Sequence, residues 1–213
     1  MKKSVLKSSL SGVAAIVGFA AVIAPAAYAA TTANSQLTQQ ITAGVISTSI
    51  RDASGAVVAS PTFAMNATSV STSQQTTTGT FGTASQRITV DNPNGSTTGG
   101  AWSLALNATT PATEKWISGA NNYAYNGTTT TGQLTVNPAA GTLTAVTGGS
   151  TGVTLGTSAA FTGSTPITLA TAASSTASIW NGYITGIGLS QAIPASQPAG
   201  TYTINITQTV TAQ

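Results

Sequence analysis

The residues best suited to hold a ligand gather between positions 114 and 126, in the stretch EKWISGANNYAYN. Aromatic rings cover the apolar faces of sugars, while side-chain amides and carboxylates bond sugar hydroxyls. The stretch therefore indicates a glycan contact formed by Trp116, Asn121, Asn122, Tyr123 and Tyr125. The same pattern is typical of a β-hairpin whose aromatic side chains pair across two strands, and this is the alternative that we favour.

The remaining side chains offer little for catalysis. The chain has no cysteine and no histidine, which excludes disulfides, thiolate chemistry and imidazole acid–base catalysis. Its three acidic residues are Asp52, Asp91 and Glu114, and nothing in their spacing pairs two of them as a glycosidase requires. Asp91 begins the stretch DNPNG, but one carboxylate does not make a calcium loop, so this stretch predicts a turn. We expect no enzyme, no metal and no other cofactor.

The first 29 residues have the features of a secretory signal peptide. Three lysines among the first seven residues precede an apolar run from 13 to 24, and Ala27-Tyr28-Ala29 supplies small residues at the cleavage-recognition positions. The run is shorter than the roughly 20 residues of a membrane-spanning helix and stops at Pro25. We predict a secreted protein with no membrane span in its mature chain.

The charge of the mature chain excludes another class of partner. Removing 29 of 213 residues leaves 184, in which Arg51, Arg87 and Lys115 balance the three acids. A formally neutral chain has no basic stripe for phosphates, so we expect no nucleic-acid partner. Low charge combined with a positive mean hydropathy of the full sequence, +0.21, also argues against disorder.

The elements that must position these residues are strands. The 41 threonines favour pleated backbone over helix, and period-two alternation is clearest in Tyr202–Val210. Other predicted strands are 86–91, 102–107, 133–136, 142–146 and 166–169. Turns separate these strands at 92–95, 137–141, 147–150 and 194–200. The spacing predicts an all-β chain with a single antiparallel, Greek-key-like β-sandwich over residues 42–213, after a polar leader at 30–41. The polar stretch 71–80 predicts an exposed loop or an edge strand.

Trp102, Leu104 and Leu106 are spaced two apart, so a strand would point all three to one face. An aromatic residue that shares a face with two leucines is most simply a core residue. We therefore expect Trp102 to be buried and not to bind a ligand.

Three segments resemble the WxL surface domains of Gram-positive bacteria. Trp102-Ser103-Leu104, following RITVDNP, looks like the first Trp-x-Leu motif of that family, and IPASQPAGTYTINIT at 193–207 is similar to its closing strand. Residues 57–61, VVASP, resemble an early piece. The second motif departs from the family, because Gln208 and Val210 stand in place of its Trp and Leu. The resemblance implies a secreted β-sandwich held non-covalently on the cell wall through peptidoglycan.

Two functions follow as expectations. The first is an extracellular cell-surface protein that associates non-covalently with the wall by binding peptidoglycan or another surface glycan. The alternative is a self-assembling subunit of a surface layer or fibre, whose partners are copies of itself or other surface proteins and whose leader or strand edges pair between copies.

Gln208 lies in phase with the apolar residues of its strand, yet an unbonded buried amide costs roughly 1–3 kcal/mol. Either partners inside the sandwich bond the amide, or the last residues of the strand extend past the core; we favour the second alternative, with Gln208 at an accessible, frayed end.

Overall fold

The computed structural model describes residues 36–95, 100–173 and 179–213. The predicted signal peptide and residues 30–35 of the predicted leader lie outside the described residues. One compact unit extends from Ile41 to Gln213, and residues 36–46 precede its first strand without belonging to a helix or strand. None of the helical structure in the described ranges is long and apolar enough to cross a membrane.

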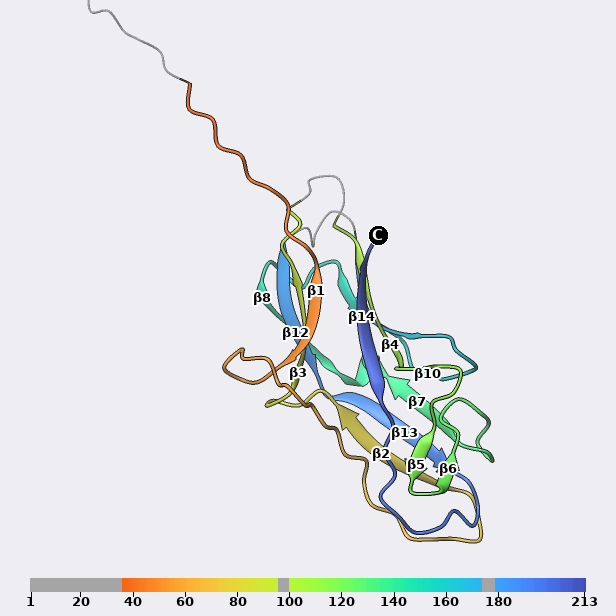
Figure 1. Ribbon diagram of the computed structural model, residues 1–213. Helices are drawn as coiled ribbons and strands as arrows, with labels where there is room; N and C mark the ends of the chain where they lie inside the picture. Colours follow the sequence, from red (N-terminus) through yellow and green to blue (C-terminus); the bar gives the residue numbers. More distant parts are fainter. Residues whose placement is uncertain (1–35, 96–99, 174–178) are drawn as a thin grey trace, which may run out of the picture. The chain divides into compact units, whose positions relative to one another are not determined.

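The described chain is all-β with antiparallel sheets, as the sequence predicted (Figure 1). The first sheet has the order β1 (Ser47–Arg51), β3 (Arg87–Asn92), β12 (Trp180–Thr185), β8 (Thr142–Thr147). The second has the order β10 (Ala159–Ala160), β7 (Gln133–Asn137), β13 (Ile187–Ile193), β2 (Gln75–Phe81). The third has the order β14 (Ile206–Ala212), β4 (Trp102–Ala108), β11 (Ile167–Ala172), β9 (Val153–Leu155). A hairpin pairs β5 (Trp116–Ser118) with β6 (Asn121–Tyr123), and a short 3-10 helix, η1, spans Pro138–Ala140.

Three segments of the chain each connect a strand of the first sheet directly to a strand of the second. Strand β12 runs into β13 through a single residue, Gly186, while β2 leads to β3 and β7 leads to β8 through short connections. Gly186 has a φ of +77° and donates its N–H to the carbonyl of Gly82 at 2.8 Å. Glycine adopts this backbone conformation without strain. The chain therefore passes from the first sheet to the second at the point where Gly186 is hydrogen-bonded to Gly82.

The main core lies between the third sheet and the first. Burial alternates along β4, so that Trp102, Leu104 and Leu106 are fully buried together. They belong to one apolar cluster with Ile88 of β3 and Trp180 of β12. The prediction that Trp102 fills a core position is confirmed. Its partner Trp180 was not anticipated from the sequence.

Most predicted strands are present within one or two residues of their expected bounds. The stretch 71–80 contains β2, which forms an edge of the second sheet, one of the two alternatives predicted for it. The predicted strand Tyr202–Val210 is regular only from Ile206. Earlier in this stretch Thr203 exchanges backbone hydrogen bonds with Ile117 of the hairpin, at 2.9 and 3.0 Å. The alternation of side chains nevertheless continues through the whole stretch, since every second residue from Tyr202 to Val210 is partly buried.

Candidate functional site

The two aromatic residues of the β5–β6 hairpin pair with each other across the strands. Trp116 lies opposite Tyr123, with ring centroids 6.1 Å apart and an interplanar angle of 15°. The indole N–H of Trp116 donates to Oε1 of the buried Gln191 on β13 at 2.7 Å. Tyr123 is buried. The hairpin therefore matches the favoured alternative, an aromatic pair that packs the hairpin onto the second sheet.

The amides of this segment are separated from its rings. Asn121 and Asn122 are exposed, as is Ile117 with 49% of its surface accessible. Lys115 donates from Nζ to Oδ1 of Asn122 at 3.4 Å. Rings and amides thus do not form the single outward-facing sugar platform that the sequence suggested.

Tyr125 is a core residue. It is fully buried, its ring packs edge-on against Phe161 at 5.2 Å, and its hydroxyl donates to the carbonyl of Pro111 at 3.1 Å. Tyr125 is therefore no longer a candidate glycan contact. Glu114 has a structural contact as well, because its carboxylate accepts hydrogen bonds from the Thr110 hydroxyl and the backbone N–H of Asn205.

The four residues aligned with the WxL motifs lie on two paired strands. In the β4–β14 register, Leu104 faces Val210 and Leu106 faces Gln208. Trp102 and Leu104 are fully buried and cannot contact a wall polymer in this conformation. The indole nitrogen of Trp102 is buried without a hydrogen-bond partner among the described residues.

The expectation of a frayed, accessible Gln208 is wrong. Seven consecutive residues of β14 pair with β4, from Ile206 opposite Ala108 to Ala212 opposite Trp102, and Gln208 lies within this ladder. Its Nε2 donates to the hydroxyl of Thr48 on β1 at 2.8 Å, whereas its Oε1 is buried and finds no partner in the described part of the chain. The frayed end was expected from proximity in sequence to the chain terminus, but the pairing with β4 continues almost to that terminus.

A small hollow lined by both polar and apolar residues lies next to the hairpin. It has a volume of about 150 Å³, and we call it the tyrosine hollow, because Tyr123 and Tyr202 line it with ring centroids 5.1 Å apart. Gln75 and Gln197 add amides, and the segments 68–71 and 193–200 supply the rest of the wall. Two hydrogen bonds fix the orientation of the Tyr202 hydroxyl. It donates to the Pro198 carbonyl at 2.9 Å and accepts from Nε2 of Gln197 at 2.8 Å.

The tyrosine hollow presents neutral polar groups at ordinary pH. Every residue that lines it is uncharged. Burial, with a smaller effect of Tyr202, raises the pKa of Tyr123 to about 12, so its phenol stays protonated. Aromatic rings beside neutral amides and hydroxyls suit an uncharged, hydroxyl-rich ligand. Of these lining residues, the sequence had indicated only Tyr123.

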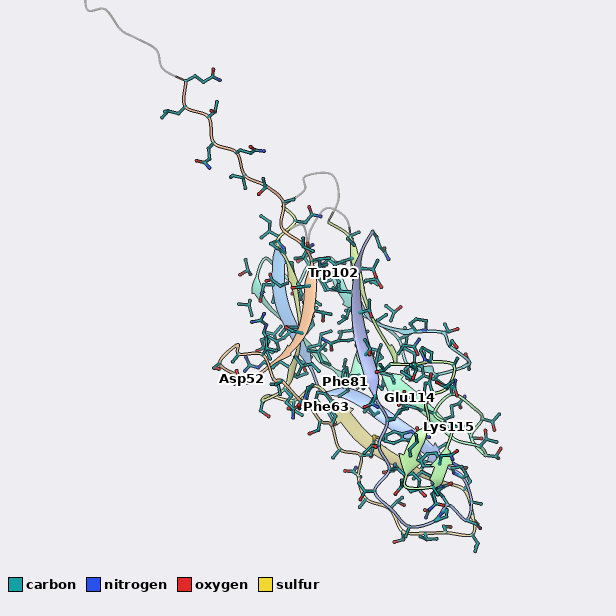
Figure 2. The ribbon with its side chains drawn as sticks, in the orientation of Figure 1. Asp52, Phe63, Phe81, Trp102, Glu114 and Lys115 are labelled. Carbon is teal, nitrogen blue, oxygen red and sulfur yellow. The ribbon has the colours of Figure 1, made fainter. Side chains whose placement is uncertain are left out.

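A larger hollow opens between β1 and β14, the edge strands of the first and third sheets. We call it the seam hollow; its volume is about 600 Å³. Its floor consists of the core residues Phe81, Leu106 and Leu134, and Ile50 and Phe63 line one wall. Figure 2 shows Phe63 beside Phe81, in an edge-on contact of 4.7 Å. Every lining residue is uncharged, and most are apolar.

The opposite wall of the seam hollow is formed by the segment from Tyr202 to Gln208. The sequence did not indicate this cavity, because its walls come from segments up to 158 residues apart in the chain. The alternation in 202–210 was the one signal for it, since it identified which side chains of that wall point inward.

Within the described residues, no three acidic, histidine or cysteine side chains gather as a metal site would require. Comparison of the chain with models of protein families, with curated proteins and with solved structures gives no match.

Proposed function

We propose that this protein is a secreted cell-surface module that associates non-covalently with the cell wall and holds a sugar unit of peptidoglycan, or of another surface glycan, in the tyrosine hollow. The observation that carries the proposal is the meeting of two tyrosine rings with two glutamine amides in one uncharged cavity. In this proposal the signal peptide directs export, and residues 42–213 form a single β-sandwich that carries the site.

The chemistry of the hollow favours a neutral sugar over other ligands. The partly exposed ring of Tyr202 can cover the apolar face of a pyranose, with the buried Tyr123 packed behind it, while Gln75 and Gln197 can bond hydroxyl or N-acetyl groups. An isolated phosphate or carboxylate would meet no cationic side chain in the lining. The resemblance of residues 87–104 and 193–207 to WxL domains supports a wall glycan as the source of this sugar.

Binding can be tested with two glutamines that are neighbours in sequence. Gln75 lines the tyrosine hollow, whereas the exposed Gln74 does not. Gln75→Ala should weaken binding to isolated Gram-positive cell walls and to soluble peptidoglycan glycan strands about tenfold, the effect of losing roughly 1–1.5 kcal/mol from one hydrogen bond. Gln74→Ala should bind as the wild type does. Equal binding by the two variants, at equal melting temperatures, would exclude the hollow as the glycan site.

The exposed tip of the hairpin can be tested separately from its aromatic pair. Replacing Trp116 or Tyr123 removes packing against the second sheet, so a loss of binding could not be separated from a loss of folding. The exposed Asn121 and Asn122 can be replaced together without disturbing that packing. Reduced wall binding by Asn121→Ala/Asn122→Ala would extend the contact surface from the tyrosine hollow to the hairpin tip, and unchanged binding would limit it to the hollow.

A second function, a self-assembling subunit of a surface layer or fibre, is favoured by one specific observation. The segment before β1 exposes three large aliphatic side chains, Leu37, Ile41 and Val45. A chain segment with this pattern gains stability when a second surface covers it.

A further inference from the structure

We propose that residues 36–46 of one copy, which we call the arm, pair with the free edge of β14 in a second copy and place their aliphatic side chains in its seam hollow. The proposal deepens the self-assembly function just described. It does not depend on glycan binding, which uses the tyrosine hollow.

The arm has the side-chain pattern of a strand that lacks its sheet. Leu37, Ile41 and Val45 are 96%, 90% and 84% exposed. Because alternate residues of an extended chain share a face, these three side chains lie on one face, and Thr38 and Thr42 lie on the other. Gln39 and Ala43 lie between them on that face, and within residues 36–46 only Ile46, on the other face, is partly buried against the core.

The seam hollow has the complementary apolar surface. Core residues of the second and third sheets, Phe81 and Leu106, form its floor, so the core is incompletely filled at this point. Ile204 and Ile206 line the cavity together with Ile50 of β1. Apolar side chains entering this cavity would remove aliphatic surface from water on both partners.

One edge of β14 also presents backbone N–H and C=O groups to which a further strand could bond. At the two ends of its pairing with β4, Thr109 donates to the carbonyl of Asn205 and Gln213 donates to the carbonyl of Ala101. In an antiparallel ladder, consecutive residues direct their N–H and C=O groups to opposite sides. The odd-numbered residues of β14 therefore bond β4, and the backbone groups of Ile206, Gln208 and Val210 point to the other edge. Such an edge accepts an added strand by ordinary sheet hydrogen bonds.

The charge and the polarity of the arm match those of the seam hollow. Residues 36–46 carry no charge, and every residue that lines the seam hollow is uncharged. The buried Oε1 of Gln208 borders the cavity and finds no donor among the described residues. A backbone or glutamine N–H of an inserted arm would supply one. An unbonded buried acceptor is costly, which favours an occupant with donors over a purely aliphatic one.

The arm of a second copy fits the geometry better than the arm of the same chain. Each chain enters β1 at Ser47, whereas its own seam hollow is bordered by Ile50, near the other end of that strand. Gly44 donates its N–H to the carbonyl of Pro93 at 3.0 Å, which fixes the chain just before β1. To reach its own hollow, the chain at residue 44 would have to leave this position and break this hydrogen bond.

Analytical ultracentrifugation of the chain from residue 30 to 213 tests assembly. The wild type should form oligomers whose sedimentation coefficient rises with concentration, and Leu37→Asp/Ile41→Asp should sediment as a monomer. The matched control, Thr38→Asp/Thr42→Asp, adds the same charge to the other face of the arm and should retain most of the assembly. A monomeric wild type, or equal assembly by the two aspartate variants, would overturn the proposal.

Cross-linking identifies the contact and the donor of the arm. Because the sequence has no cysteine, an Ile41→Cys chain mixed with an Ile204→Cys chain should form the mixed disulfide in preference to the two homodimers if an arm occupies the seam hollow of another copy. The mixed dimer should form under mild oxidation, and an excess of a synthetic peptide of residues 36–46 should suppress it. Absence of the mixed dimer, with an intramolecular disulfide in the double variant Ile41→Cys/Ile204→Cys, would refute exchange between copies. The aspartate variants should still bind cell walls, so failure of assembly and failure of glycan binding are read separately.

Discussion

The indole rings of Trp102 and Trp180 lie 5.2 Å apart with an interplanar angle of 40°, and this contact joins β4 of the third sheet to β12 of the first. Both side chains are fully buried. Trp102 is therefore part of the packing between sheets. Its role in any wall association would be indirect, through the stability of the domain.

Trp102→Ala should lower the free energy of unfolding by about 3–5 kcal/mol, the usual cost of emptying a large aromatic site. Trp180→Ala should have a similar effect. Because the two rings touch, the double variant should be less destabilised than the sum of the single variants by about 0.5–1.5 kcal/mol. Urea denaturation of the four proteins measures this coupling. A Trp102→Ala protein with the wild-type midpoint that no longer bound walls would instead support a ligand-binding tryptophan.

Gly182 is predicted to be essential for the position of Trp180. A Cβ at residue 182 would lie 2.4 Å from two atoms of the Trp180 ring and 2.6 Å from the carbonyl oxygen of Thr144. Gly182→Ala should therefore destabilise the protein by about 1–3 kcal/mol, the typical cost of overpacking. Gly188, on β13, is the control, because a Cβ there meets its nearest neighbours at an ordinary 3.6 Å. Equal melting temperatures for the two alanine variants would show that the ring moves aside freely.

The hydrogen bond between Gln208 and Thr48 predicts an asymmetric response to mutation. Thr48→Val leaves the half-buried amide of Gln208 without its partner and should cost about 1–3 kcal/mol. Gln208→Leu removes the amide together with its unbonded Oε1, so the change should stay within about 1 kcal/mol of the wild type. Thr48→Val should then lower the free energy of unfolding less in the Gln208→Leu variant than in the wild type. A larger loss from Gln208→Leu than from Thr48→Val would indicate that Oε1 has a partner in solution.

The raised pKa of Tyr123 predicts a loss of stability at alkaline pH. With a folded pKa of about 12 against about 10 when unfolded, the unfolded chain releases this proton first. The stabilisation is complete below about pH 10 and is lost as pH rises toward 12. Tyr123→Phe should flatten this alkaline decline in denaturation midpoints measured from about pH 9 to about pH 12. Tyr183→Phe, which alters a ring next to Arg87 on another strand, should leave the decline in place.

Local patterns predicted the strands whose side chains alternate without interruption. Strands β3, β4 and β7 match the expected ranges, because apolar residues at every second position are buried in each of them. Strand β12 was missed, because its inward positions are Trp180, Gly182 and Ile184, and a glycine between two large residues does not look like an apolar face. The glycine is required only because the Trp180 ring occupies the space beside it, which no local pattern can show.

The candidate sites were harder to predict than the strands, because long-range pairing creates them. The sequence identified the aromatic hairpin, but not the contact of Tyr123 with Tyr202, which lies 79 residues further along the chain. Alternation correctly placed Gln208 on the inward face of its strand. It could not show that β4, about 100 residues earlier in the chain, holds that strand in register almost to its end.

The register of β1 has a mechanical consequence. All five of its residues pair with β3, from Ser47 opposite Asp91 to Arg51 opposite Arg87, and the chain preceding β1 enters at the Ser47 end. A tension applied through that chain along the strand axis would load the ladder in shear, so that its hydrogen bonds share the force instead of breaking one after another. A copy held by a neighbour through its N-terminal segment would then resist extraction by the shared strength of these hydrogen bonds, without a disulfide, since the chain has no cysteine.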